Sequence, residues 1–168
     1  SNALSWVLAW PIVTAIVLGV AYAAQKPNLV SGKKENGSFN FILVVINLPR
    51  LLLTWSIWFL QKYLSTENRI DHINGTNWYI SSYPGMSYPE GDFDFIIDLT
   101  AEFPRARNAD NNYLCFPNLD GVAISNLPQA PGFNSSSKVL VHCAQGHGRS
   151  ATWSSLVLAK LEVFNSAF

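Results

Sequence analysis

Nine residues near the end of the chain combine a thiol, an arginine and two glycines at a spacing that suits phosphate chemistry. They are His142, Cys143, Ala144, Gln145, Gly146, His147, Gly148, Arg149 and Ser150. The apolar run 139–141 before them predicts a buried strand, and the run 151–159 after them predicts a helix. A loop between a strand and a helix N-terminus turns backbone N–H groups toward one point, where the helix dipole adds positive potential. The nine residues therefore predict an anion site that fits a phosphate group.

Within this loop, one cysteine and one arginine supply what phosphoryl transfer by a thiolate needs. Cys143 lies at the base of the predicted loop, where the N–H groups and Arg149 would stabilise a thiolate. That thiolate is placed for in-line attack on a bound phosphorus. Arg149 can hold the phosphate with two parallel hydrogen bonds, which a lysine could not supply. We expect the phosphate-binding residues to be Ala144, Gln145, Gly146, His147, Gly148 and Arg149.

The stretch 139–150 is similar to the signature of the cysteine-dependent protein phosphatases, in their dual-specificity branch. A cysteine and an arginine six positions apart is a weak signal alone. The flanking histidine, the loop glycines, the serine after the arginine and the strand-to-helix context make the pattern specific. The alternative is a buried structural cysteine before an ordinary helix. The resemblance covers roughly residues 70–165 and implies an α/β fold, with a phosphatase-like central sheet flanked by helices.

The resemblance also implies roles for residues around the nucleophile. Asp120 lies in a stretch, 116–121, that resembles the family's acid loop. It would protonate the leaving oxygen and then take a proton from the attacking water; a turn or helix-cap aspartate is the alternative. His142 would organise the loop without acting as a base, and Ser150 would donate a hydrogen bond to the thiolate. His147 would lie at the rim of the site, where a purely surface role is the alternative.

Two further residues bear on the chemistry. Asp98 is a rival general acid, but it lies in the predicted strand 95–99, so we interpret it as structural. Cys115 lies in the predicted strand 113–116. We expect this strand to neighbour the strand before residues 142–150, which we call the signature loop. In some relatives a second cysteine there forms a reversible disulfide with the nucleophile, and the resemblance suggests this for Cys115. The alternative is a small buried hydrophobic residue.

The charge is unevenly distributed, although the net charge is zero. Residues 1–66 contain five Lys or Arg and one Asp or Glu, a net of +4, whereas residues 67–168 contain six and ten, a net of −4. No basic stripe is present, so nucleic acid is not an expected partner. Two cysteines form neither a disulfide framework nor a zinc ligand set, and a reactive thiol favours the cytoplasm. We expect no metal or other cofactor, because the arginine and the amides supply the positive charge.

The N-terminal part predicts a membrane-associated helical region over residues 4–65. Residues 4–24 contain no charge. As a helix rising about 1.5 Å per residue, they match a hydrocarbon core of ~30 Å. Residues 39–60 are also apolar but contain Pro49 and Arg50, so they would span with a kink or lie in the interface. A buried helix of a soluble domain, or a signal peptide at the N-terminus, is the alternative.

The two apolar segments allow two topologies. The connector between them, residues 25–38, carries three lysines. If both segments span, the connector and residues 66–168 lie on opposite sides of the membrane. If the second segment is interfacial, both lie in the cytoplasm, which the thiol favours. We interpret residues 1–3 as the remnant of a cleaved expression tag. Residues 66–168 are interpreted as a catalytic domain truncated at its C-terminus, with a Pro-containing stretch at 127–132 in place of a longer helix of the family.

The sequence thus predicts hydrolysis of phosphomonoesters through a cysteinyl-phosphate intermediate. The resemblance implies phosphorylated tyrosine, serine or threonine side chains as substrates. The membrane-associated segments suggest a phospholipid headgroup as an alternative. A non-catalytic module that binds phosphorylated partners, and the sulfur or arsenate chemistry of a rhodanese-like loop, are further alternatives.

Overall fold

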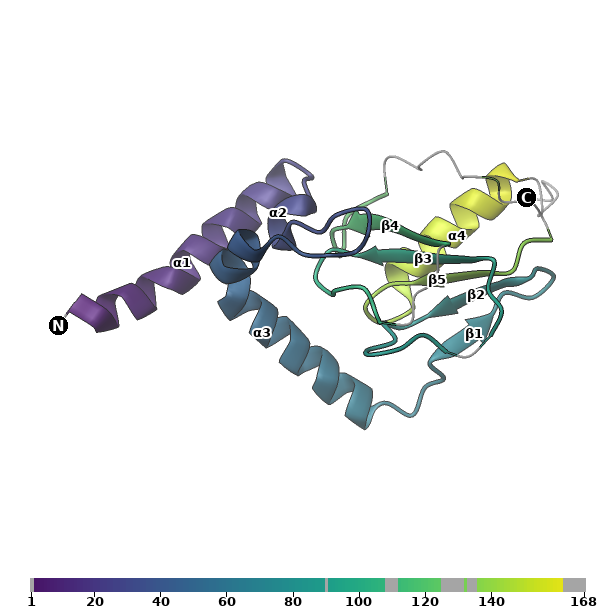
Figure 1. The fold of residues 1–168 in the computed structure, drawn as a ribbon, viewed down its shortest axis with the longest axis horizontal. Coiled ribbons are helices and arrows are strands. Elements are labelled where there is room, and N and C mark those ends of the chain that lie inside the picture. The colour runs from purple at the N-terminus through teal and green to yellow at the C-terminus, as the bar shows by residue number, and fades with distance from the viewer. Residues whose placement is uncertain (1, 90, 108–111, 125–131, 133–135, 162–168) are drawn as a thin grey trace.

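A computed structural model describes residues 2–89, 91–107, 112–124, 132 and 136–161. Over these residues the chain forms three helices, a five-stranded sheet and a final helix (Figure 1). The helices are α1 (Asn2–Ala23), α2 (Asn28–Ser31), α3 (Phe41–Leu64) and α4 (Gly148–Lys160). The strands are β1 (Ile70–His72), β2 (Trp78–Ser81), β3 (Phe95–Thr100), β4 (Tyr113–Asn118) and β5 (Val139–His142). The expected α/β class is confirmed, whereas the predicted interruption at 127–132 lies outside the described residues, apart from Gly132.

The sheet places the strand before the signature loop in its middle. The strand order is β1-β2-β5-β3-β4, with β1 antiparallel to β2 and all other neighbours parallel. All four residues of β5 are buried. Parallel strands end at the same edge of a sheet, and the loops at that edge are where such folds bind ligands. The loop after β5 therefore starts at the centre of the carboxyl edge.

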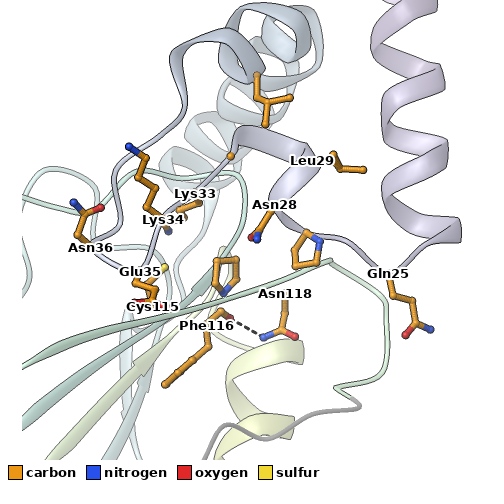
Figure 2. Close-up of a pocket in the computed structure, with 14 residues that line it drawn as sticks. Gln25, Asn28, Leu29, Lys33, Lys34, Glu35, Asn36, Cys115, Phe116 and Asn118 are labelled. Atoms are coloured by element: carbon orange, nitrogen blue, oxygen red, sulfur yellow. Dashed lines mark hydrogen bonds between the residues drawn. The ribbon is translucent and has the colours of Figure 1, made fainter.

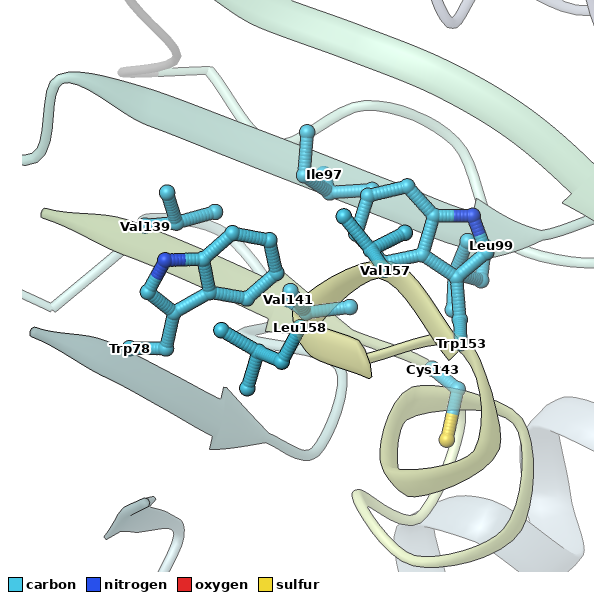
Figure 3. Packing of buried hydrophobic residues seen from close by; sticks show 9 residues of the cluster. All are labelled: Trp78, Ile97, Leu99, Val139, Val141, Cys143, Trp153, Val157 and Leu158. Atoms are coloured by element: carbon cyan, nitrogen blue, oxygen red, sulfur yellow. The ribbon is translucent and has the colours of Figure 1, made fainter. Parts of the chain in front are cut away.

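Both faces of the sheet are buried, because β5 alternates between two apolar clusters. On the face that α4 covers, the cluster contains Trp78, Ile97, Leu99, Val139, Val141, Cys143, Trp153, Val157 and Leu158 (Figure 3). Leu140 points to the opposite face, since successive side chains of a strand alternate. The cluster on that face contains Tyr88, Ile96, Ala106, Tyr113, Cys115 and Leu140. Because the sheet separates the two clusters, side chains in one cluster do not contact side chains in the other.

A third apolar cluster joins the N-terminal helices to the carboxyl edge of the sheet. It contains Ala21, Val30, Leu51, Ala101 and Leu119. These residues come from α1, α2, α3 and the segments that follow β3 and β4. The N-terminal helical region therefore packs against the segments that surround the signature loop.

Helix α3 continues through Pro49 without ending there. Proline has no N–H, so the carbonyl of Val45 loses its partner within the helix. The indole Nε1 of Trp10 in α1 lies 3.1 Å from the carbonyl oxygens of both Val45 and Ile46, and Thr14 Oγ1 donates to Ile46 O at 2.7 Å. Side chains of α1 thus bind the carbonyl groups that the proline exposes, which holds the two helices together.

The connector between α1 and α3 is docked into the sheet through a buried lysine. Lys33 Nζ donates to Asp98 Oδ2 at 2.6 Å and to the carbonyl oxygen of Thr100 at 2.9 Å, and the side chains of Lys33 and Asp98 are fully buried. The connector and residues 66–168 therefore lie together. With this contact formed, both would have to be on the same side of any membrane that the helices enter.

Among the described residues, α3 is the one helix that is long and apolar enough to cross a membrane. Only 17% of its apolar window is buried in the protein. The apolar stretch of α1, Ala9–Ala23, is shorter. Length and composition alone therefore give weak support for a membrane span.

Candidate active site

The sulfur of Cys143 faces the signature loop. The backbone N–H of Gly146 donates to Sγ at 3.2 Å, and the hydroxyl oxygen of Ser150 lies 3.4 Å from Sγ. Cys143 is 3% exposed and lies at the edge of the cluster under α4, with its sulfur directed away from the other labelled side chains (Figure 3). The structure therefore brings the predicted nucleophile, loop amide and serine together as expected.

The loop keeps its shape because Gly146 fits tightly against the end of β2. Its φ is +84°, a left-handed conformation that side chains disfavour. A Cβ atom there would lie 2.7 Å from the backbone nitrogen of Ser82 and 2.9 Å from the carbonyl carbon of Ser81. Any other residue would have to move the loop or the strand, so the sequence needs glycine at this point.

The carbonyl group of Ala144 fixes the first part of the loop from outside. Its oxygen accepts hydrogen bonds from the N–H of Tyr83 at 3.1 Å and from the indole Nε1 of Trp58 at 2.9 Å. In a planar trans peptide the C=O and the following N–H point in opposite directions. The N–H of Gln145 therefore points away from these donors, as an amide of an anion site must.

Arg149 is held by a carboxylate that leaves one edge of its guanidinium for a ligand. Nη1 lies 3.1 Å from Oε2 of Glu102, and Nη2 lies 2.5 Å from Oε1 of Glu102. The second N–H of Nη1 donates to the carbonyl oxygen of Asn118 at 2.9 Å. Burial disfavours the charge, but the hydrogen bonds and the charge of Glu102 raise the pKa of Arg149 above its ordinary value. Nε and the second N–H of Nη2 share an edge of the guanidinium, and this edge can still make two parallel hydrogen bonds.

Asp120 lies at that same edge. Its Oδ1 is 3.2 Å from Nε of Arg149, although the N–H is not aligned for a hydrogen bond. The carboxylate is 77% exposed, on the turn after β4. The hydroxyl group of Tyr22, at the end of α1, donates to the carbonyl oxygen of Asp120 at 3.1 Å. The predicted general acid is therefore adjacent to the predicted phosphate clamp and accessible from solvent.

Glu102 is a site residue that the sequence reasoning missed. It follows the end of β3, which is a direct neighbour of β5 in the sheet. Because parallel strands end at one edge, a carboxylate just after β3 falls beside the loop after β5. The sequence could have indicated this, because Glu102 comes three residues after the predicted strand 95–99.

His142 is fully buried at the end of β5, on the same face of the sheet as Leu140 and Tyr88. Its Nε2 lies 3.0 Å from the hydroxyl oxygen of Tyr88 and 3.7 Å from Oδ2 of Asp98. Burial, partly offset by Asp98, lowers the pKa of His142 to about 4. The imidazole is therefore neutral at pH 7, which agrees with an organising role.

Asp98 is bound on both carboxylate oxygens. Oδ2 accepts from Lys33 and from the hydroxyl group of Tyr113 at 2.6 Å each, and Oδ1 accepts from the N–H of Thr100 at 2.8 Å. Its side chain is fully buried. Asp98 therefore holds the connector and β4 in place, which agrees with the structural interpretation.

The expectation that the strand of Cys115 neighbours the strand before the signature loop was wrong, and the alternative of a small buried residue fits the structure. Its strand, β4, pairs with β3 and not with β5. Its side chain lies in the cluster on the opposite face of the sheet from Cys143. Burial raises the pKa of its thiol to about 11, so it is protonated and unreactive at pH 7. A disulfide between the two cysteines would require the sheet to come apart.

Cys115 instead contributes to the floor of a broad groove of about 1070 Å³ between the connector and β4 (Figure 2). The side chains around it come mainly from residues 25–36 and 115–118. None of the signature-loop residues lines this groove. Its size therefore does not make it the candidate active site.

His147 lies on the surface at the rim of the loop. Its Nε2 is 3.0 Å from Oε2 of Glu67, and both side chains are mainly exposed. An exposed pair of this kind contributes little to stability. The structure agrees with the rim position, which leaves both of its predicted roles open.

A smaller cavity of about 260 Å³ adjoins the signature loop. Its walls are formed by the loop residues Ala144 and Gln145, by the two carboxylates Glu102 and Asp120, and by one side of α3. This volume is near the lower end of ligand pockets, which span about 300–1,000 Å³. Cys143 and Arg149 are not among the residues that line it, so the cavity lies beside the first part of the loop.

The comparisons with known proteins gave no match to a family model, a curated protein or a solved structure. The function must therefore be argued from the geometry of the site.

Proposed function

We propose that the protein hydrolyses phosphomonoesters, with Cys143 as the nucleophile and a cysteinyl-phosphate as the intermediate. The observation that carries this proposal is the sulfur of Cys143 hydrogen-bonded within the loop, at 3.2 Å from the N–H of Gly146 and 3.4 Å from the hydroxyl of Ser150. Donors around a sulfur stabilise its thiolate form. A merely structural cysteine would have no need of them.

The first chemical step forms a sulfur–phosphorus bond and breaks the bond between phosphorus and the ester oxygen. The thiolate of Cys143 attacks in line, and Asp120 gives its proton to the departing oxygen. The loop amides and the Nε–Nη2 edge of Arg149 stabilise the charge on the equatorial phosphate oxygens. Glu102 keeps that edge in position without occupying it.

The second step returns the enzyme to its starting state. Asp120, now ionised, takes a proton from water, and the oxygen of that water attacks phosphorus. The sulfur leaves as a thiolate, which the hydroxyl of Ser150 stabilises by a hydrogen bond. Inorganic phosphate is released, and Asp120 is protonated again for the next cycle.

We also propose that this reaction takes place at the cytoplasmic surface of a membrane, with either a phosphorylated protein or a phosphorylated phospholipid as substrate. Large apolar side chains are exposed along α1 and α3, among them Ile16, Leu53 and Phe59. Exposed apolar surfaces of this extent mark protein or membrane interaction sites. Because the same helices contact the site, the substrate would be met close to that surface.

Turnover of para-nitrophenyl phosphate by the full chain tests the proposed chemistry. Cys143→Ser should abolish turnover while oxyanion binding, measured with tungstate by calorimetry, is retained. Asp120→Asn should lower kcat by roughly 10²–10⁴-fold for an alkyl phosphate, whose poor leaving group needs a proton, and by less for para-nitrophenyl phosphate. Full activity of Cys143→Ser would refute the mechanism. Oxyanion binding without any turnover by the parent protein would instead support a non-catalytic binding module.

A further inference from the structure

Arg50 of α3 is a partly buried cation that has no role in the site described above. It lines the 260 Å³ cavity next to the signature loop, together with Glu102 and Ala144. Its Nε and Nη2 atoms are shielded from solvent and have no hydrogen-bond partner among the described residues. Shielded charged donors without partners are costly, and native structures rarely leave them so. This points to a ligand that Arg50 binds.

The side of α3 that faces the cavity carries both polar and apolar residues. Arg50, Thr54, Ile57, Trp58 and Gln61 all line the cavity, and their spacing of three or four residues, with Ile57 and Trp58 adjacent, places them on one helix face. The opposite side exposes large apolar residues, including Leu52 and Phe59. One helix therefore forms the wall of the cavity with one face and presents an apolar surface with the other.

Arg50 is the one cation among the residues that line the cavity, which also include the carboxylates of Glu102 and Asp120. Both oxygens of Glu102 are already engaged by Arg149, and the carboxylate of Asp120 lies at the outer, exposed end. Arg149 and the loop amides are accounted for by the phosphomonoester that reacts. Arg50 thus supplies a second positive charge, which is not needed to bind the reacting phosphate.

We infer that Arg50 binds a second phosphate of the substrate, so that the preferred substrate carries a phosphodiester near the phosphomonoester that Cys143 attacks. This inference rests on the proposed function. Such a pair of groups occurs in the headgroup of a phosphorylated phospholipid and in the corresponding soluble headgroup. The apolar outer face of α3 favours the lipid, because it would place the cavity at the level of the headgroups.

The test compares four substrates with the full chain. They are a phosphatidylinositol monophosphate in phosphatidylcholine vesicles, phosphatidic acid in the same vesicles, the deacylated glycerophosphoinositol monophosphate and para-nitrophenyl phosphate. The first and third carry both a phosphomonoester and a phosphodiester, whereas the other two carry one phosphate. Released inorganic phosphate, or para-nitrophenol for the last substrate, gives kcat/KM in each arm.

Arg50→Gln should lower kcat/KM for the two substrates with a second phosphate by roughly 10–100-fold, the size expected for a charge-assisted hydrogen bond. The loss should exceed the loss on phosphatidic acid and on para-nitrophenyl phosphate by about tenfold, and Arg50→Lys should recover part of it. Arg107→Gln, the same change at an exposed arginine, is the matched control and should alter no arm. A higher kcat/KM for the vesicle substrate than for the soluble headgroup would identify the lipid as the source.

Equal losses in all four arms would overturn the inference, whether they come from misfolding or from a general role of Arg50. It would also be overturned by a loss confined to the vesicle substrates. A phosphotyrosine peptide is assayed as a fifth substrate, and the inference fails if this peptide is turned over faster than the lipid and shows the same sensitivity to Arg50. In each of these cases turnover of para-nitrophenyl phosphate by the parent protein would leave the proposed function standing. If the parent protein hydrolyses none of these substrates, both the proposed function and this inference fail.

Discussion

At the scale of single residues, the ion pair between Glu102 and Arg149 fixes the orientation of the guanidinium in the candidate site. Both side chains are nearly buried, at 9% and 3% exposed. An arginine without this partner would be free to turn, and its charge would remain uncompensated in a shielded place. The ion pair therefore orients the guanidinium of Arg149, in addition to any contribution to stability.

Glu102→Gln tests this orientation. The variant keeps an acceptor oxygen but loses the charge and one of the two bonds to Arg149, so we expect kcat/KM for para-nitrophenyl phosphate to fall by roughly 10–100-fold. Steady-state kinetics with a thermal unfolding scan would measure it. Glu67→Gln is the matched control, since Glu67 pairs with His147 on the surface and should change kcat/KM by less than about twofold. Equal effects of the two variants would contradict the role of Glu102.

His142 leads to a prediction about pH. Its pKa in the folded protein is about 4, below the value of about 6.5 expected after unfolding. Between these values the unfolded chain binds more protons, so the free energy of unfolding falls as pH decreases from 6.5 to 4, by about 3 kcal/mol in total. Urea unfolding at several pH values would measure this slope.

The comparison for this prediction is His142→Asn, which should reduce the pH dependence in that window. His72→Asn, on the exposed strand β1, should leave the slope as it is in the parent protein. Carboxylates also titrate in this range, so the informative quantity is the difference between the two variants. If both variants keep the slope of the parent protein, the burial of a neutral His142 is not its cause.

At the scale of elements, the turn from β5 into α4 gives the site its shape, and Gly146 is the residue on which that turn depends. Gly146→Ala would place a Cβ atom 2.7 Å from the backbone of Ser82. Gly75 has a nearly equal φ of +79°, but open space surrounds it. Gly75→Ala therefore isolates the cost of the backbone conformation, about 1–2 kcal/mol.

We expect Gly146→Ala to be more destabilising than Gly75→Ala by a further 1–3 kcal/mol or so, because the loop must also move. The displaced N–H of Gly146 would no longer reach Cys143, so the activity of Gly146→Ala should fall by about tenfold or more. Gly75→Ala should retain full activity. Urea unfolding and aryl phosphate kinetics on both variants would measure the differences. Similar values for the two alanine variants would show that the close approach to β2 is unimportant.

Periodicity and turn residues were sufficient to predict the elements that form the site. The strand 139–141 and the helix that follows it correspond to β5 and α4, and the predicted strands 95–99 and 113–116 are present as β3 and β4. The short strand β1 was not predicted, because its three residues show little burial and no alternation. The order of the strands was not predicted either. The predicted position of Cys115 was wrong for this reason, because the pattern of apolar residues within a strand does not show which strands pair with each other.

At the scale of the whole molecule, the N-terminal helices are part of the site. Trp58 of α3 binds the signature loop, Tyr22 of α1 binds the acid loop, and Lys33 of the connector is buried against Asp98. The sequence predicted only apolar helices and a lysine-bearing connector here. A buried lysine cannot be distinguished from an exposed one by its neighbours in sequence, because its partner lies 65 residues away. The contacts of the N-terminal helices with the sheet could therefore be found only in the structure.

The exposed face of α3 carries a prediction about the membrane. Leu53 and Leu60 are 61% and 56% exposed, and transfer of a leucine side chain from water to lipid is favourable by about 1.5–3 kcal/mol. The double variant Leu53→Glu with Leu60→Glu should lower the fraction of protein that sediments with phospholipid vesicles by about tenfold or more. Leu156→Glu, at an exposed position of α4, is the control and should sediment as the parent protein does. Equal sedimentation of all three proteins would argue against this face as the membrane contact.

The central claim is that Cys143 itself receives the phosphoryl group. It is tested most directly by acid quenching of the protein during turnover of a ³²P-labelled aryl phosphate, followed by peptide mapping. We predict label on the peptide that contains Cys143, at a level that rises within the first turnover and is missing in Cys143→Ser. Turnover without covalent label, or label on a different residue, would contradict the account.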